Sequence, residues 1–180
     1  MLRTIRCTIF LCALISIPAF AQRVEIFGGA QFEHLENSFN AVGWNASLTG
    51  NFKHVLGITA DFGGVYKSRH VNSSVYTYTV GPVLTARLPV VQPFVHALFG
   101  VARESQDAIP IACAQITPVC PGPFSLGSDT SFATAIGAGF DVKLAPFVKL
   151  RLIQVDYLRT QLHGATQNQP RASAGIVFHF

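Results

Sequence analysis

Residues 171–180 read RASAGIVFHF, and the side chains along this stretch alternate in character. One set of alternate residues is apolar and comprises Ala172, Ala174, Ile176, Phe178 and Phe180, whereas the other comprises Arg171, Ser173, Gly175, Val177 and His179. Successive side chains of a β-strand point to opposite faces, so this pattern gives one apolar face and one mostly small or polar face. The stretch therefore predicts a β-strand.

The same period-two alternation recurs along the chain and predicts eight strands in all. They cover residues 24–33, 42–52, 55–65, 75–87, 92–103, 130–143, 148–158 and 171–180. Each is close to the ~9–11 residues with which a tilted strand crosses a bilayer. No stretch shows the apolar period of an amphipathic helix, so we expect an all-β protein with eight antiparallel strands.

The first 21 residues have the features of a secretory signal peptide. Arg3 and Arg6 provide a basic start, residues 8–17 are mostly apolar, and Ala19-Phe20-Ala21 is a small-residue cleavage pattern. The apolar stretch is shorter than the ~20 residues of a membrane-spanning helix. We expect cleavage after Ala21, which leaves residues 22–180 as one domain.

The composition is unusual for a soluble domain of this size. Charged residues make up 12% of the chain, whereas soluble domains average about 25%. The formal net charge is +4, of which Arg3 and Arg6 contribute two, and this excess is too small to indicate nucleic-acid binding. Because no apolar run after Ala21 is long enough for a membrane helix, the low charge favours strands that face lipid on one side.

The seven links between the predicted strands also differ in character. Links around Lys53-His54, LPVV and LAPF are short, whereas HLENSFN, YKSRHVNSS, residues 104–129 and RTQLHGATQNQP are longer or more polar. Short periplasmic turns that alternate with longer external loops are typical of outer-membrane barrels. The sequence therefore predicts an up-and-down transmembrane barrel with both chain ends on the periplasmic side.

The two faces of the strands can be assigned from this interpretation. An eight-stranded barrel has a narrow interior, so the small and polar set should face inward and the apolar set should face lipid. We expect a lumen-facing polar group of Thr59, Asp61, His96, Asp141, Gln154 and Asp156. By the same parity Phe27 and Phe94 point inward and Lys149 and Arg151 point outward, near the periplasmic rim. Pro82 lies inside a strand and lacks a ladder donor, which predicts a bulge there.

Aromatic residues are expected in two girdles at the membrane surfaces. The predicted outer girdle contains Trp44, Tyr76, Tyr78, Phe132 and Tyr157, and the predicted inner girdle contains Phe52, Phe140, Phe147, Phe178 and Phe180. A secreted lipocalin-like barrel is the alternative, but it would have an apolar interior and a charged exterior.

Several stretches resemble one known family. GWNASLTGNF, LGITADFGG, PFVHALFGVAR, AIGAGFDVKL, RLIQVDYLRT and the final GIVFHF are similar to small outer-membrane β-barrels of the OmpA- and OmpX-like family. The resemblance implies an integral outer-membrane barrel. The sequence departs from the larger members in showing no C-terminal peptidoglycan-binding module, so their anchoring role is not expected here. It also implies that the last strand, with Ile176, Phe178 and Phe180, is a signal read by the outer-membrane assembly machinery. Expected partners are therefore this machinery and outer-membrane lipids, with no nucleic acid and a monomeric state.

No motif for catalysis, cofactor binding or metal binding is present in the sequence. The histidines at 34, 54, 70, 96, 163 and 179 lack metal-ligand spacing, and no serine stands in a recognisable nucleophile motif. Three functions stay open: a structural or interaction barrel that displays loops, a narrow porin-like pore, and a lipid-modifying enzyme, of which the first is favoured.

Cys113 and Cys120 are the only cysteines after Ala21, and export to an oxidising compartment favours a disulfide between them.

Overall fold

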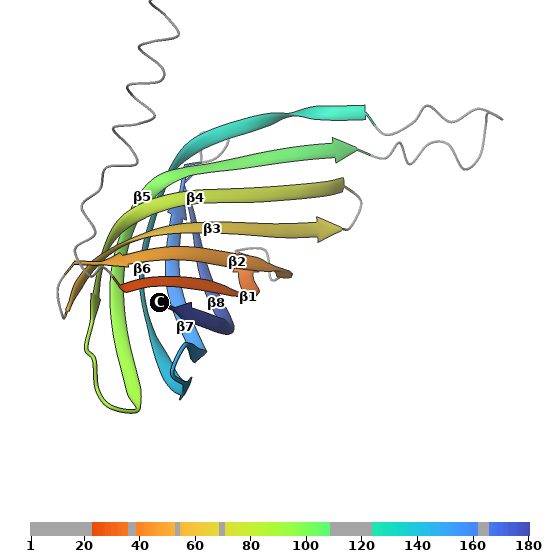
Figure 1. Ribbon diagram of the computed structural model, residues 1–180. Helices are drawn as coiled ribbons and strands as arrows, with labels where there is room; N and C mark the ends of the chain where they lie inside the picture. The colour runs from red at the N-terminus through yellow and green to blue at the C-terminus, as the bar shows by residue number, and fades with distance from the viewer. Residues whose placement is uncertain (1–22, 36–38, 53–54, 69–70, 109–123, 162–165) are drawn as a thin grey trace, which may run out of the picture.

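The computed structural model describes residues 23–35, 39–52, 55–68, 71–108, 124–161 and 166–180. They form eight antiparallel strands that close into one barrel in sequence order (Figure 1). The strands are β1 (Arg23–Leu35), β2 (Phe39–Asn51), β3 (Leu56–Ser68), β4 (Val71–Thr85), β5 (Val91–Ala108), β6 (Phe124–Ala145), β7 (Val148–Thr160) and β8 (Gln167–His179). The predicted fold class is thus confirmed. Among the described residues, no helix has the length and apolar character to cross a membrane.

The barrel closes between its first and last strands. β1 and β8 pair from Glu25↔His179 to Glu33↔Arg171. Beyond these pairs the Val24 amide donates to the Phe180 carbonyl at 3.3 Å, and the Phe180 amide donates to the Val24 carbonyl at 2.9 Å. Closure leaves no strand edge, which matters because unpaired backbone groups are costly in hydrocarbon. We call this end of the barrel the terminal end and the opposite end the loop end.

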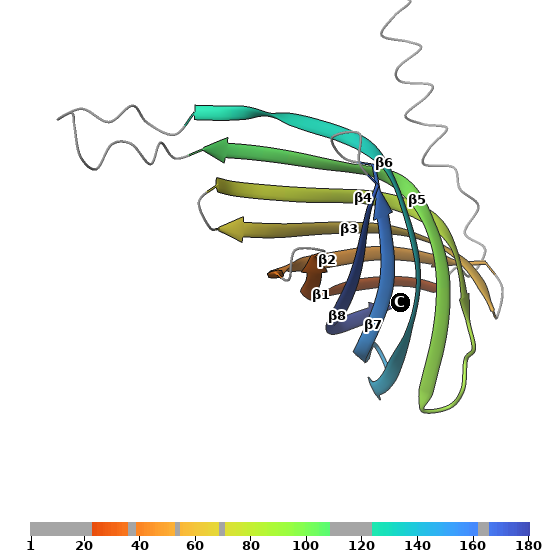
Figure 2. The ribbon, with the colours of Figure 1, turned by 180° about the vertical axis from the view of Figure 1, so that it is seen from behind.

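Several strands extend further at the loop end than the sequence predicts. β5 and β6 are the longest, with 18 and 22 residues, and β3 to β6 reach beyond β1 and β8 (Figures 1 and 2). The strand bounds leave links at 36–38, 52–55, 69–70, 86–90, 109–123, 146–147 and 161–166. The predicted alternation of short and long links is therefore wrong for the first four, because polar residues assigned to loops lie in strands.

Pro82 does not cause the predicted bulge. The pairs of β4 with β5 keep one register on both sides of it, with Val80↔Phe99 and Val83↔His96, while Gly81 and Pro82 are unpaired on that side. On the other side Pro82 pairs with Ile58 in regular register. The missing donor thus interrupts the β4–β5 ladder locally and adds no residue to the strand.

A bulge occurs instead in β7 and reverses the predicted parity of its first residues. The register of β7 against β6 shifts between the pairs Phe140↔Ile153 and Asp141↔Arg151, and its register against β8 shifts between Arg151 and Gln154. Leu152 and Ile153 are consequently both exposed on the outer surface, and Lys149 and Arg151 are buried inside. The prediction that Lys149 and Arg151 point outward was wrong for this reason.

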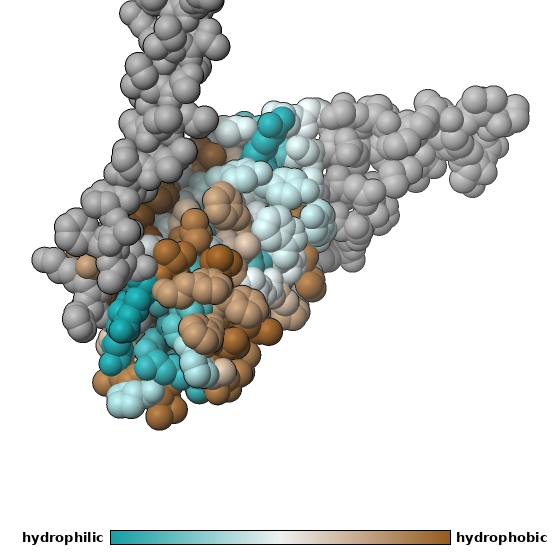
Figure 3. All heavy atoms as spheres, in the orientation of Figure 1, coloured by the Kyte–Doolittle hydropathy of each residue, from teal (hydrophilic) through white to brown (hydrophobic). Residues whose placement is uncertain are grey.

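The outer surface of the barrel is apolar. Exposed side chains include Val42, Leu48, Ile58, Val95, Phe99, Ile136, Phe140, Ile153, Val155 and Ile176, all on the predicted lipid-facing parity. Figure 3 shows hydrophobic side chains spread over much of the visible face. An exposed apolar surface of this extent is unusual for a soluble monomer and matches the outward band of a transmembrane barrel.

Aromatic side chains contribute to both ends of this surface. Trp44, Tyr78, Phe132 and Tyr157 are exposed towards the loop end, and Phe52, Phe140, Phe147, Phe178 and Phe180 towards the terminal end. The Trp44 Nε1 donates to the Tyr66 hydroxyl at 3.3 Å, and the Tyr66 and Tyr76 rings meet edge to face at 6.3 Å. Aromatic side chains with a polar tip suit the membrane–water interface.

Candidate functional site in the barrel interior

Polar side chains occupy much of the interior, and the buried charged groups of the described residues gather there. The structure places all six residues of the predicted lumen group there, each at most 6% exposed: Thr59, Asp61, His96, Asp141, Gln154 and Asp156. Period two explains this placement, since every second residue of a barrel strand faces the lumen. The interior also contains charged residues that the sequence reasoning did not place there, namely Glu25, Glu33, Glu104, Lys149 and Arg151.

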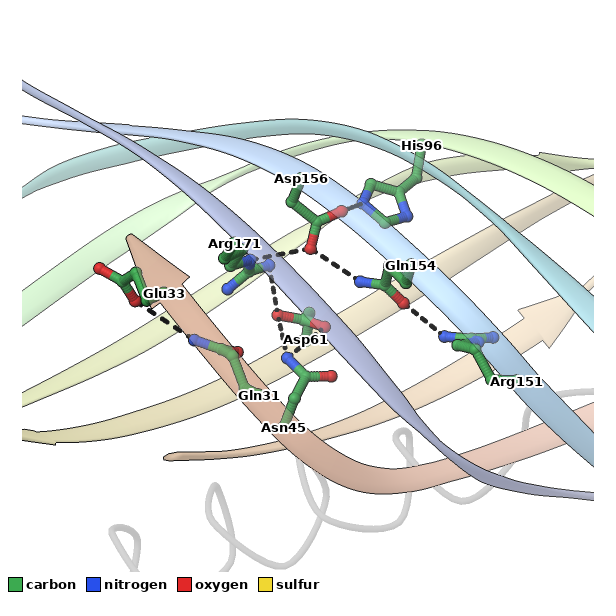
Figure 4. Close-up of polar contacts among 9 residues, drawn as sticks. All are labelled: Gln31, Glu33, Asn45, Asp61, His96, Arg151, Gln154, Asp156 and Arg171. Atoms are coloured by element: carbon green, nitrogen blue, oxygen red, sulfur yellow. Dashed lines mark hydrogen bonds and ion pairs between the residues drawn. The ribbon is translucent and has the colours of Figure 1, made fainter. Parts of the chain in front are cut away.

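Arg171 is at the centre of the interior network (Figure 4). Its Nε donates to Asp156 Oδ2 at 2.8 Å, and its Nη2 donates to Asp61 Oδ1 at 3.0 Å. Asp156 is the direct partner of Arg171 on the neighbouring strand β7, whereas Asp61 lies on β3, so the contact with Asp61 crosses the bore of the barrel. The side chains of all three residues are at most 2% exposed, and buried charges of this kind need paired, hydrogen-bonded partners.

The network continues from Asp156 in two directions. His96 Nε2 lies 2.8 Å from Asp156 Oδ1, and Gln154 Nε2 donates to Asp156 Oδ2 at 2.8 Å. Asn45 Nδ2 contacts both oxygens of Asp61 at 3.1 Å. Asp61, His96 and Gln154 are therefore linked through Arg171 and Asp156. Thr59 pairs separately with Thr49 at 2.8 Å.

Arg151 forms a second centre nearer the terminal end. Its Nε and Nη2 donate to the two oxygens of Asp141 at 2.8 and 3.1 Å, and its Nη1 donates to Gln154 at 2.7 Å. The guanidinium lies between the rings of Phe27 and Phe94, 4.4 and 4.3 Å from their centroids. Planar guanidinium groups favour both bidentate pairing and aromatic stacking, so a single side chain joins β1, β5, β6 and β7.

The position of the Phe94 ring depends on Gly139. A Cβ atom on Gly139 would lie 2.5 Å from Phe94 Cζ, closer than packed atoms can approach. Replacing Gly139 by alanine should therefore displace the ring from Arg151 and lower the free energy of unfolding by about 1–3 kcal/mol. Urea titration of the folded barrel in detergent measures this loss.

Gly28→Ala is the matched control, because a Cβ there meets nothing within 4 Å. We expect it to change the free energy of unfolding by less than about 0.5 kcal/mol. Equal losses in the two variants would show that Gly139 does not hold the Phe94 ring in place.

One part of the inner wall is apolar, which the sequence reasoning did not anticipate. Leu98, Ala102, Ala133, Ala135 and Leu158 form a buried cluster on β5, β6 and β7. Ala41 and Val65 form a smaller one on β2 and β3. Small and branched side chains fill a narrow lumen as a packed core does. The interior thus combines a polar network with an apolar lining.

Little free volume lies between these groups. An interior cavity of about 20 Å³ is lined by Thr59, Asp61, His96, Asp141, Arg151, Gln154 and neighbouring side chains, which is room for roughly one water molecule. Several of the lining residues belong to the network described above: Asp61 pairs with Arg171, and Arg151 pairs with Asp141. Among the described residues, no group of three or more His, Cys, Asp or Glu side chains could hold a metal ion.

Comparisons with known proteins identify the fold. The sequence matches no protein-family model, and no curated protein matches it. Solved structures do match: the attachment invasion locus protein Ail of Yersinia pestis in complex with sucrose octasulfate has a TM-score of 0.59 and 18% identity, covering 87% of this chain and 99% of Ail. Neisserial surface protein A has a TM-score of 0.62 and 14% identity, covering 88% and 97%.

A third match is the N-terminal barrel domain of Pseudomonas aeruginosa OprF, with a TM-score of 0.53, 14% identity and coverage of 88% of this chain and 97% of that domain. In all three comparisons the aligned region covers nearly the whole of the other chain, at low sequence identity. The chain therefore has the fold of the small eight-stranded outer-membrane β-barrels, as the resemblance in its sequence implied.

Proposed function

We propose that this protein is an integral barrel of the bacterial outer membrane that spans the bilayer and displays its loop-end segments outside the cell. One observation carries the proposal: the barrel is apolar outside and polar inside, the reverse of a soluble barrel. A bilayer stabilises this arrangement, since closure satisfies the backbone hydrogen bonds and lipid covers the apolar face. The solved barrels with the same fold are also proteins of the bacterial outer membrane.

Cell fractionation combined with a gel of heated and unheated samples tests this proposal. We expect the protein in the outer-membrane fraction, without residues 1–21, and migrating differently before and after heating because the closed barrel resists detergent. Recovery as a soluble periplasmic protein, with one mobility in both samples, would contradict it.

We infer a structural or interaction role for the barrel rather than a pore or an enzyme. The Arg171–Asp61 contact crosses the lumen from β8 to β3, and the Arg151 guanidinium lies against Phe27 of β1 and Phe94 of β5. Eight-stranded barrels have interiors that side chains fill. His96 lies inside this network and not on the surface, away from any lipid substrate. Planar-bilayer recordings should show no stable conductance, and lipids of a deletion strain should be unmodified relative to wild type.

The last residue is proposed to serve assembly more than stability. Phe180 is 69% exposed at the terminal end, and Phe147 is 66% exposed at the same end, so Phe147→Ala is a control with equal loss of lipid contact. We expect Phe180→Ala to slow outer-membrane assembly in cells several-fold more than Phe147→Ala, while both variants have similar free energies of unfolding in detergent. Equal assembly rates would mean that Phe180 acts only as a membrane-surface aromatic.

Cys113 and Cys120 lie outside the described residues, and a disulfide between them remains our proposal. It would close a short ring in the longest link and stabilise it by about 2.5 kcal/mol on a chain-entropy basis. Thiol labelling of the unreduced native protein should find no reactive thiol. Two labelled cysteines in the native barrel would refute the bridge.

A further inference from the structure

Three polar atoms from three strands converge on the lumen side of Gly63. A Cβ atom on Gly63 would lie 2.7 Å from Thr77 Oγ1, 3.3 Å from Gln31 Oε1 and 3.5 Å from Arg171 Nη1. All three atoms are thus within 3.5 Å of one point in front of β3. Glycine at position 63 is what leaves this point free of side-chain atoms.

Each of these atoms is buried without a hydrogen-bond partner among the described protein groups. The three residues are 1–4% exposed: Gln31, Arg171 and Thr77. The other two nitrogens of the Arg171 guanidinium bind Asp156 and Asp61, and Figure 4 shows the third directed away from both. An unsatisfied buried donor or acceptor costs free energy, and three at one point indicate a bound molecule that pairs with them.

The charges around the point determine what that molecule can be. Arg171 is already neutralised by Asp61 and Asp156, so the surrounding carboxylates disfavour an anion. The guanidinium itself disfavours a cation. Arg171 Nη1 requires an acceptor, Gln31 Oε1 requires a donor, and the Thr77 hydroxyl accepts either. A neutral molecule that both donates and accepts satisfies all three.

We propose that Gly63, Gln31, Thr77 and Arg171 form a binding site for one ordered water molecule within the barrel. The water accepts from Arg171 Nη1, donates to Gln31 Oε1 and exchanges a hydrogen bond with Thr77. Buried waters typically make about three hydrogen bonds to otherwise unsatisfied groups, which is the number available here. The site joins β4, through Thr77, to the Arg171 contacts with β3 and β7.

Thr77→Val tests the site because valine keeps the shape of threonine and removes the hydroxyl. If the water is bound, the variant loses one of its hydrogen bonds, and the ratio of folded to unfolded protein should fall about fivefold. If the hydroxyl has no partner, its removal should leave this ratio unchanged or raise it. An unchanged or raised ratio would overturn the proposal.

Gly63→Ser and Gly63→Ala provide a matched pair, since both add the same Cβ next to the proposed water. The serine hydroxyl can replace the water as a partner of Arg171 and Gln31, whereas alanine cannot. We expect Gly63→Ser to retain a higher folded fraction in urea than Gly63→Ala. In addition, Thr77→Val should have no further effect in the Gly63→Ala background, because the water is already displaced.

A crystal structure of the wild-type barrel tests the site without any substitution. We expect one water within hydrogen-bond distance of Arg171 Nη1, Gln31 and Thr77. If the three side chains instead pair directly with protein groups, the site does not exist, whatever the stability of the variants.

Discussion

Replacing Arg171 by methionine is expected to lower the free energy of unfolding of the barrel by about 3–5 kcal/mol. The substitution leaves Asp61 and Asp156 buried without the guanidinium that bridges them at 3.0 and 2.8 Å. Both carboxylates are 1% exposed, so water cannot replace the lost partner at low cost. Urea unfolding of the purified barrel in detergent or lipid vesicles gives the free energy directly.

Arg159→Met is the control for this prediction. The chemical change is the same, but Arg159 lies on β7 and its side chain is exposed on the outer surface. We expect it to change the free energy of unfolding by less than about 1 kcal/mol. Restoring stability to Arg171→Met by adding Asp61→Asn and Asp156→Asn would show that the unpaired charges cause the loss. A loss of the same size in Arg159→Met would contradict a central role for Arg171.

Replacing Val155 by arginine is expected to cost about 2–4 kcal/mol, because it places a charge on the lipid face near the bilayer midplane. Val155 is 49% exposed on the outer surface, and its strand neighbours are Ala138 on β6 and Ala172 on β8. Neither neighbour can pair with the guanidinium. Folding into vesicles under a urea gradient measures the loss.

Gln161→Arg is the control for Val155→Arg. Gln161 is exposed just after the end of β7, on the same outward parity as Val155 but nearer the membrane surface. Near the membrane surface an added arginine costs only about 0–1 kcal/mol. Thr59→Ser, inside the lumen, should also be tolerated. If Val155→Arg were no more costly than these two variants, the outer face of β7 would not contact lipid.

The number of strands and the faces of most of them could be predicted from the sequence. Period-two alternation is a local property, so stretches such as AIGAGFDVKL place Ile136, Ala138 and Phe140 on one face whatever the partner strands are. The structure places the predicted polar group inside for the same reason. Strand ends were less predictable, because polar residues that extend beyond a bilayer carry no apolar alternation, as in β3 and β4.

The bulge in β7 was missed although the sequence contains a signal for it. In LRLIQVDY, Leu150 and Leu152 follow one parity, whereas Ile153, Val155 and Tyr157 follow the other. Two adjacent apolar residues at the change, Leu152 and Ile153, indicate an extra residue in the strand. Extending the second parity backwards put Arg151 outside and concealed its place between Phe27 and Phe94.

The pairing of interior residues could not be predicted from local patterns. Lys149 contacts Glu25 at 2.8 Å across 124 positions of sequence, and Arg171 contacts Asp61 across 110. Such contacts depend on the stagger of the strands around the barrel, which alternation within one strand does not specify. Alternation predicted the inward face of most strands but not of the start of β7, and the closed barrel determines which inward side chains meet.

The central claim of this account is that the apolar face of the barrel contacts lipid and the polar face is enclosed. The single tryptophan of the chain, Trp44, lies on the outer surface and is 41% exposed. Fluorescence quenching by lipids with brominated acyl chains tests the claim on the wild-type protein. The matched variant is Trp44→Phe with Phe27→Trp, which moves the only tryptophan to an interior aromatic position. We predict strong quenching of Trp44 by brominated lipid and weak quenching of the interior tryptophan. Strong quenching of the interior tryptophan together with weak quenching of Trp44 would contradict the orientation of the barrel wall.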